Sequence, residues 1–144
     1  MKRIVTGVAV AAVVGCLTSV RSYAEEEAQD ARVRKGKVWY ETYCMPCHAA
    51  GGAPGAAVFS DTKKPVDLRS YAKRNGGKFP SVRWWDVTFG SQPGNAHTKV
   101  WERIRSAQAN KYADSDPGVG FERDIGAREV VGNIEMYVMS VQEK

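Results

Sequence analysis

Cysteine and histidine are scarce in this chain, which has three cysteines and two histidines among its 144 residues. Cys44 and Cys47 lie three positions apart, whereas Cys16 lies in a separate apolar segment. A small exported domain stabilised by disulfides uses a larger set of cysteines. A structural zinc site needs four ligands. Both a disulfide framework and a zinc site are therefore disfavoured.

Long apolar runs and strand-like alternation are also missing. The apolar segment 4–17 is too short for a comfortable membrane span. No segment alternates apolar and polar residues with the period of two that strands require, and we find no internal repeat. The sequence therefore predicts one all-α domain.

The N-terminal segment has the layout of a secretory signal peptide. Lys2 and Arg3 precede the apolar stretch, and the small-x-small site 22–24 follows it. We predict that residues 1–24 are a signal peptide and that residues 25–144 form a domain in the periplasm. Two alternatives would attach the protein to a membrane: an uncleaved signal, or a lipid on Cys16, because residues 13–16 resemble a loose lipobox.

Hydrophobic spacing and turn residues divide the rest of the chain into helices and loops. We expect the charged residues 25–35 to be the frayed start of a helix, with a clear helical pattern from about Ala31. The expected helices are 31–44, 67–74, 82–89, 98–109 and 127–141, with Ser81 as an N-cap. The last has a continuous apolar face. Residues 49–65 and 112–126 are expected to be loops.

The segment 44–48, Cys-Met-Pro-Cys-His, fits the C-x-x-C-H signature of c-type haem attachment. Two thiols on one turn can reach the two vinyl groups at one edge of a porphyrin. His48, the next residue, can then bind the iron. A thioredoxin-like dithiol is the main rival, but that motif follows a buried strand, whereas residues 35–40 are helical in pattern.

Around this motif the sequence resembles the class I c-type cytochromes over about residues 34–142. The matching residues are Gly36 and Tyr40 before the motif, Tyr137 in the last helix, and the segment 65–90. The resemblance implies a class I cytochrome c fold, in which the N- and C-terminal helices cross beside one covalent haem. It also implies that the second ring N–H of His48 donates a hydrogen bond to a backbone carbonyl near Pro54.

The sequence departs from this family at the second iron ligand. These cytochromes use a methionine in a loop after the motif, but no methionine lies between Met45 and Met136. His97 lies close to the expected position. The alternatives are an open sixth position, Lys99, or a methionine of the last helix, Met136 or Met139. Trp84, Trp85 and Trp101 could line the haem or bind a propionate, although core packing is the commoner role of such residues.

These features predict an electron carrier with one haem c and no enzymatic activity of its own. If the sixth position is open, gas or peroxide binding, sensing or catalysis becomes the alternative. Without Lys2, Arg3 and Arg21 the chain has 18 basic and 16 acidic residues, so nothing favours nucleic acid. The segment 63–83 contains seven basic residues and one acidic residue, and acidic residues predominate from 114 to 143. This is either a solvated surface of mixed sign or a dipole that steers an acidic redox partner.

Overall fold

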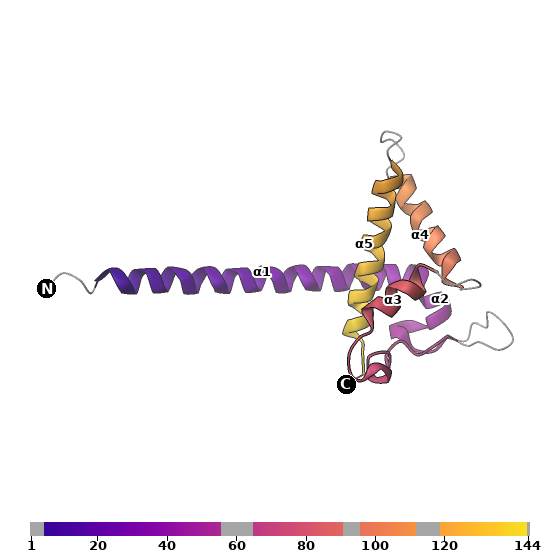
Figure 1. Cartoon of the computed structure of the whole chain (residues 1–144), viewed down its shortest axis with the longest axis horizontal. Coiled ribbons are helices and arrows are strands. Elements are labelled where there is room, and N and C mark those ends of the chain that lie inside the picture. Colours follow the sequence, from indigo (N-terminus) through magenta and orange to yellow (C-terminus); the bar gives the residue numbers. More distant parts are fainter. Residues whose placement is uncertain (1–4, 56–64, 91–95, 112–118, 144) are drawn as a thin grey trace. The chain divides into compact units, whose positions relative to one another are not determined.

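The computed structural model describes the backbone of residues 5–55, 65–90, 96–111 and 119–143, and the side chains of 23–55, 65–90, 96–109 and 124–143. Within these ranges the chain is helical and has no strand, which confirms the all-α prediction. The helices are α1 (Val5–Tyr43), α2 (Met45–His48), α3 (Ser81–Thr88), α4 (His97–Lys111) and α5 (Val119–Ser140), with 3-10 turns at Ala50–Gly52 and Lys73–Asn75 (Figure 1).

The chain divides into two compact units, Met1–Ala31 and Arg32–Lys144. The side chains of residues 1–22, including Cys16, lie outside the described set. Among the described residues, no helix is both long enough and apolar enough to cross a membrane. The second unit contains every element that the candidate site uses.

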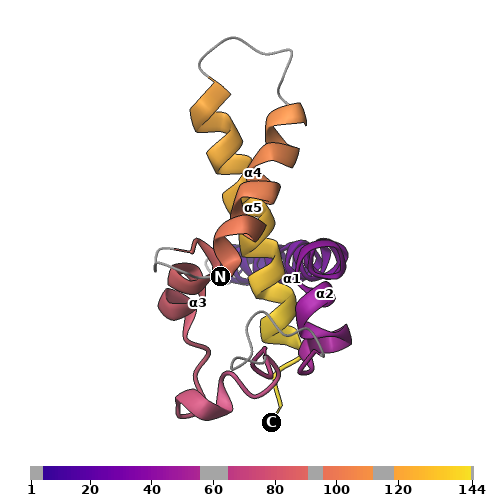
Figure 2. The same cartoon turned by 90° about the vertical axis from the view of Figure 1, so that its right-hand side faces the viewer.

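The core of the second unit lies between α4 and α5, which run side by side, with α3 beside them (Figures 1 and 2). Ile104 of α4 packs in the same cluster as the apolar face of α5. That face is buried as predicted: Val130, Val131, Ile134, Tyr137 and Val138 are each less than one-tenth exposed. Burial of this stripe supplies the apolar contact that stabilises the helix pair.

Several predicted boundaries were wrong. Helix α5 begins at Val119, so residues 119–126 are helical and not a loop. The charged residues 25–35 are part of α1, as expected of the start of a helix, although α1 itself begins at Val5. The helix expected over 67–74 is replaced by turns and a short 3-10 segment. Asp67 accepts a hydrogen bond from the backbone N–H of Arg69 (3.0 Å), a local turn that competes with the helix. Ser81 is the first residue of α3 and not its N-cap.

Gly36 brings α1 against α5. A Cβ at this position would overlap the backbone carbonyl of Asn133 and touch the side chain of Tyr137. One turn further along, the ring of Tyr40 packs on the ring of Tyr137, with centroids 5.2 Å apart. Glycine, which has only a hydrogen atom in place of a side chain, thus allows the two backbones to approach closely at this point.

Replacement of Gly36 by alanine is therefore expected to destabilise the fold. Relief of the overlap requires α1 and α5 to separate, and overpacking of this kind costs about 1–3 kcal/mol of unfolding free energy. Gly132→Ala is the matched control, because its Cβ would meet only ordinary contacts, the nearest at 3.5 Å from Arg32. That variant should stay within about 1 kcal/mol of the parent. Denaturant unfolding measures both, and equal stabilities would contradict the close approach.

Candidate functional site

The C-x-x-C-H motif occupies a single helical turn. Helix α1 ends at Tyr43, and the backbone N–H of His48 donates to the carbonyl of Cys44 at 2.9 Å. The side chains of Cys44 and Cys47 are half-buried and not joined in a disulfide, and that of His48 is buried. Ala49 then ends the turn in the left-handed region, with φ of 53°. The two thiols and the imidazole are therefore presented together by one short element.

The two thiols lie in surroundings that disfavour their ionised form. Burial, with a smaller contribution from Cys47, raises the pKa of Cys44 to about 12. Burial also raises the pKa of Cys47, although the nearby Arg103 acts in the opposite direction. A redox-active dithiol depends on a thiolate of lowered pKa. The segment before Cys44 is moreover a helix and not a strand, so the structure gives a thioredoxin-like role no support.

The imidazole of His48 is oriented by a backbone carbonyl. Its Nδ1 lies 3.2 Å from the carbonyl oxygen of Val66. Because a carbonyl can only accept, Nδ1 must carry the proton, and the lone pair lies on Nε2. The expected acceptor near Pro54 was therefore the wrong one: Pro54 is exposed, and the chain returns to His48 at Val66, beyond Pro65. This is the arrangement that fixes a metal-binding histidine.

The carbonyl of Val66 is held in place by contacts that the sequence did not reveal. The N–H of Leu68 donates to the carbonyl of Gly52 at 2.8 Å. Gln142, just beyond α5, donates to the carbonyl of Leu68 at 2.8 Å and accepts from the N–H of Ala72 at 2.7 Å. The C-terminal residues thus anchor the segment that orients His48. No sequence pattern pairs position 142 with 68.

Tyr40 supports the end of the motif through its hydroxyl group. Its ring is fully buried, and its hydroxyl donates to the carbonyl of Ala49 at 2.8 Å, with the carbonyl of His48 at 3.2 Å. These are carbonyls at the end of α2, where no further helical turn supplies donors. Burial raises the pKa of the Tyr40 hydroxyl, which therefore remains a donor at every physiological pH.

His97 reaches the same place from a different element. It is the first residue of α4, and it is half-buried. The next residue, Thr98, donates its hydroxyl to the carbonyl of Gly90 at 3.2 Å. Gly90 has φ of 65°, and a Cβ there would overlap Thr98. The tight turn at Gly90 therefore positions the start of α4.

The rings of the two histidines lie near each other as a nearly parallel, stacked pair. Their centroids are 6.1 Å apart, and their planes differ by 19°. A metal–imidazole bond is about 2 Å long and each ring centre lies roughly 1 Å behind its nitrogen, so ligands on opposite sides of one metal have centroids about 6 Å apart. Burial lowers the pKa of both imidazoles, with His48 adding to the effect on His97. Neutral rings with a lone pair are the form that binds a metal.

The other candidate ligands lie in different surroundings. Lys99 and Met139 are exposed, and Met136 is half-buried on α5. Within the described ranges, no group of three or more His, Cys, Asp or Glu side chains is arranged to hold a metal ion. A metal between His48 and His97 would therefore need the remaining ligands from a cofactor such as a tetradentate ring.

The three tryptophans pack in or against the core. Trp84 is buried, and Trp85 and Trp101 are partly buried against the same cluster. The Nε1–H of Trp84 is the one buried side-chain polar group that lacks a partner within the described part of the chain. A buried donor of this kind is normally satisfied by an acceptor. A carboxylate of a bound cofactor is one acceptor that would satisfy it.

The chain was compared with models of protein families, with characterised proteins and with solved structures, and none of them matched. What the site can do is therefore argued from its own residues. They are two uncharged thiols and two neutral, nearly parallel imidazoles, which are gathered by α1, α2 and α4.

Tyr40→Phe is expected to loosen the motif without changing its shape. Loss of the hydroxyl leaves the carbonyls of His48 and Ala49 without their donor, which costs about 1–2 kcal/mol of unfolding free energy. Tyr137→Phe is the matched control, because the hydroxyl of Tyr137 donates to no described residue. Denaturant unfolding of the purified protein measures both. If the two variants lose the same stability, the hydroxyl of Tyr40 does not support the motif.

Proposed function

We propose that this chain is an exported electron-transfer cytochrome with a class I cytochrome c fold and one haem c. Thioether bonds at Cys44 and Cys47 would attach the haem, and His48 and His97 would bind its iron from opposite sides. One observation carries the proposal: two nearly parallel imidazoles with centroids 6.1 Å apart, one of them next to the paired cysteines.

The environment of the cysteines supports covalent attachment. The thiols are on one turn, and the pKa of each is raised by burial. A thioether sulfur carries no ionisable proton. Attachment of the haem would therefore place an uncharged sulfur in surroundings that disfavour a thiolate. The resemblance to class I cytochromes also agrees with the contact of Gly36 and Tyr40 with α5.

When bound, the haem would supply one-electron chemistry between ferric and ferrous iron. The chain's own contribution is ligation and orientation. The carbonyl of Val66 holds Nδ1 of His48 and leaves Nε2 available, and the contact of Thr98 with Gly90 positions His97, so these two side chains would hold the iron. Two imidazoles set a lower reduction potential than an imidazole with a thioether. If both imidazoles held the iron, neither coordination position would be open to another molecule, which is the arrangement of an electron carrier.

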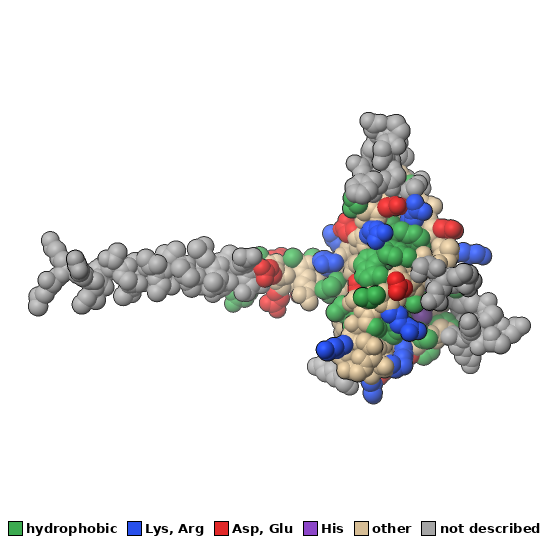
Figure 3. Space-filling model, in the orientation of Figure 1, with side chains coloured by type: hydrophobic (Ala, Val, Ile, Leu, Met, Phe, Trp, Pro, Cys, Tyr) green, Lys and Arg blue, Asp and Glu red, His purple; other side chains and the backbone are tan. Residues whose placement is uncertain are grey.

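A partner with an acidic surface is the second part of the proposal. Lys73, Arg74, Lys78 and Arg83 are exposed, whereas Arg69 pairs with Asp67 at 2.7 Å. In Figure 3 basic side chains lie on the lower part of the visible face, and others are scattered over its upper part among acidic ones. Lys63, Lys64 and Asp114 lie outside the described residues. Such a field would accelerate encounter with an acidic redox protein and would weaken with salt.

The ligand proposal is tested by electron paramagnetic resonance of the ferric protein, expressed with haem-attachment machinery. We expect a low-spin signal of the bis-imidazole type. His97→Ala should convert it to high spin, and added imidazole should restore low spin. Lys99→Ala, two residues away and exposed, is the matched control and should leave the signal unchanged.

Two results would contradict the assignment of His97. One is a low-spin signal that survives His97→Ala, which would point to Met136, Met139 or Lys99. The other is a high-spin signal in the parent protein. That result would mean an open iron and would favour gas or peroxide binding, sensing or catalysis.

Export is tested by the mass of the protein recovered from the periplasm. We expect a chain that begins at Glu25 and carries the mass of one haem. Loss of the haem mass in a Cys44→Ala, Cys47→Ala variant would tie the added mass to these thiols. A diacylglycerol on Cys16, or a chain that retains residues 1–24, would instead place the protein on a membrane.

A further inference from the structure

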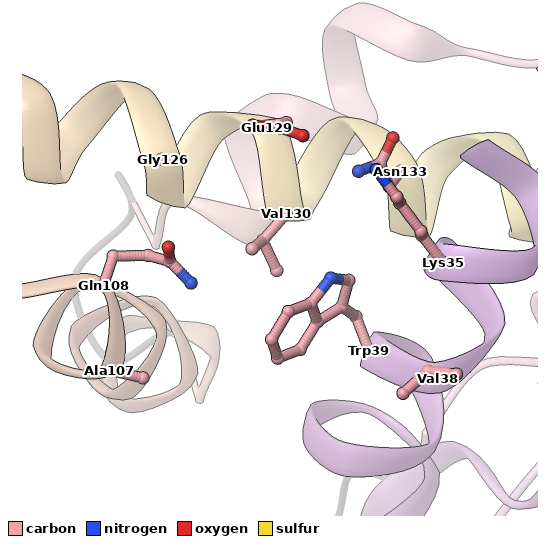
Figure 4. A pocket seen from close by; sticks show the side chains of 9 residues that line it. All are labelled: Lys35, Val38, Trp39, Ala107, Gln108, Gly126, Glu129, Val130 and Asn133. Atoms are coloured by element: carbon pink, nitrogen blue, oxygen red, sulfur yellow. The ribbon is translucent and has the colours of Figure 1, made fainter. Parts of the chain in front are cut away.

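A pocket of about 550 Å³ lies between α1, α4 and α5, away from the two histidines. Its walls are Val38 and Trp39 of α1, Ala107 and Gln108 of α4, and Val130 of α5, with Lys35 and Glu129 among the remaining lining residues (Figure 4). The volume is in the range of small-molecule sites. Neither the cysteines nor the histidines line it, so it is separate from the proposed haem site.

The apolar part of the pocket is a flat surface. Trp39 is half-buried, and its indole is held by the ring of Tyr43, with centroids 5.9 Å apart and planes 20° apart. Val130 is 4% exposed and closes the side that belongs to α5. The indole projects into the space between the three helices (Figure 4). A flat ring beside a planar aromatic molecule gives favourable stacking.

The polar part of the pocket is the side-chain amide of Gln108. Gln108 is 7% exposed, and no described residue forms a hydrogen bond with its side chain. Figure 4 shows this amide directed into the pocket, toward Trp39. By contrast, Asn133 is engaged, because Arg32 donates to its Oδ1 at 3.2 Å. Because the amide of Gln108 lines the pocket, it is available to a ligand that enters there.

We propose that this pocket binds an uncharged, planar aromatic molecule that carries a carbonyl oxygen. The ring would stack on Trp39, and the oxygen would accept a hydrogen bond from the amide of Gln108. Lys35 and Glu129 contribute one charge of each sign, so they favour neither an anion nor a cation. The proposal goes beyond electron transfer and does not depend on the haem.

The test compares two probes of equal shape, 1-indanone and indane, which differ by one carbonyl oxygen. Both are titrated into the reduced, ¹⁵N-labelled protein while the Trp39 indole and Gln108 amide resonances are followed by NMR. We expect saturable shifts of both resonances with 1-indanone, and binding roughly tenfold tighter than that of indane. The indole of Trp101, which does not line the pocket, is the internal reference and should not shift.

Two variants assign the binding to named groups. Gln108→Leu should weaken 1-indanone roughly tenfold and leave indane unchanged, because it removes only the amide. Lys35→Met should leave both affinities within about twofold, since an exposed charge contributes little to an uncharged ligand. If Gln108→Leu fails to fold, Trp39→Leu replaces it and should weaken both probes.

Three results would overturn the proposal: no saturable shift of the Trp39 indole, equal affinity for the two probes, or unchanged 1-indanone binding in Gln108→Leu. None of them bears on the haem, because His48 and His97 lie outside the pocket. Conversely, a protein without bis-imidazole ligation could still bind 1-indanone.

Discussion

The close approach of α1 and α5 at Gly36 is the constraint on which the rest of the site depends. Because no side chain intervenes there, Tyr40 can pack on Tyr137 one turn later. The same packing aims the Tyr40 hydroxyl at the carbonyls after the motif. A separation of the helices at Gly36 would therefore move the support of His48 as well. The absence of a side chain at Gly36 thus connects the crossing of α1 and α5 with the orientation of His48.

The second constraint is that His48 and His97 reach each other from segments that share no local interaction. His48 is fixed by Val66, which in turn depends on the hydrogen bonds of Leu68 with Gly52 and Gln142. His97 is fixed by the turn at Gly90. Each imidazole thus has its own support.

What the sequence could predict is what short-range patterns encode. The placement of the C-x-x-C-H segment on one turn and the apolar stripe of α5 depend on spacings of three and four residues, and the structure has both. The Val66 acceptor and the role of Gln142 were missed because they join residues far apart in the chain. The helix expected over 67–74 failed for a local reason, since Asp67 forms a turn with Arg69. His97 was named from its place in the sequence, but its distance from His48 requires the fold.

Burial lowers the pKa of the two imidazoles and raises the pKa of the Cys44 thiol, so it keeps all three groups uncharged. It keeps His48 and His97 neutral and so preserves the lone pairs that a metal needs. It also keeps Cys44 protonated, which suppresses the thiolate chemistry that a free dithiol would use. A site for a reactive thiol would need the reverse, an exposed sulfur near positive charge. Burial therefore favours neutral imidazoles at His48 and His97 and disfavours thiolate chemistry at Cys44, which agrees with the proposed haem site.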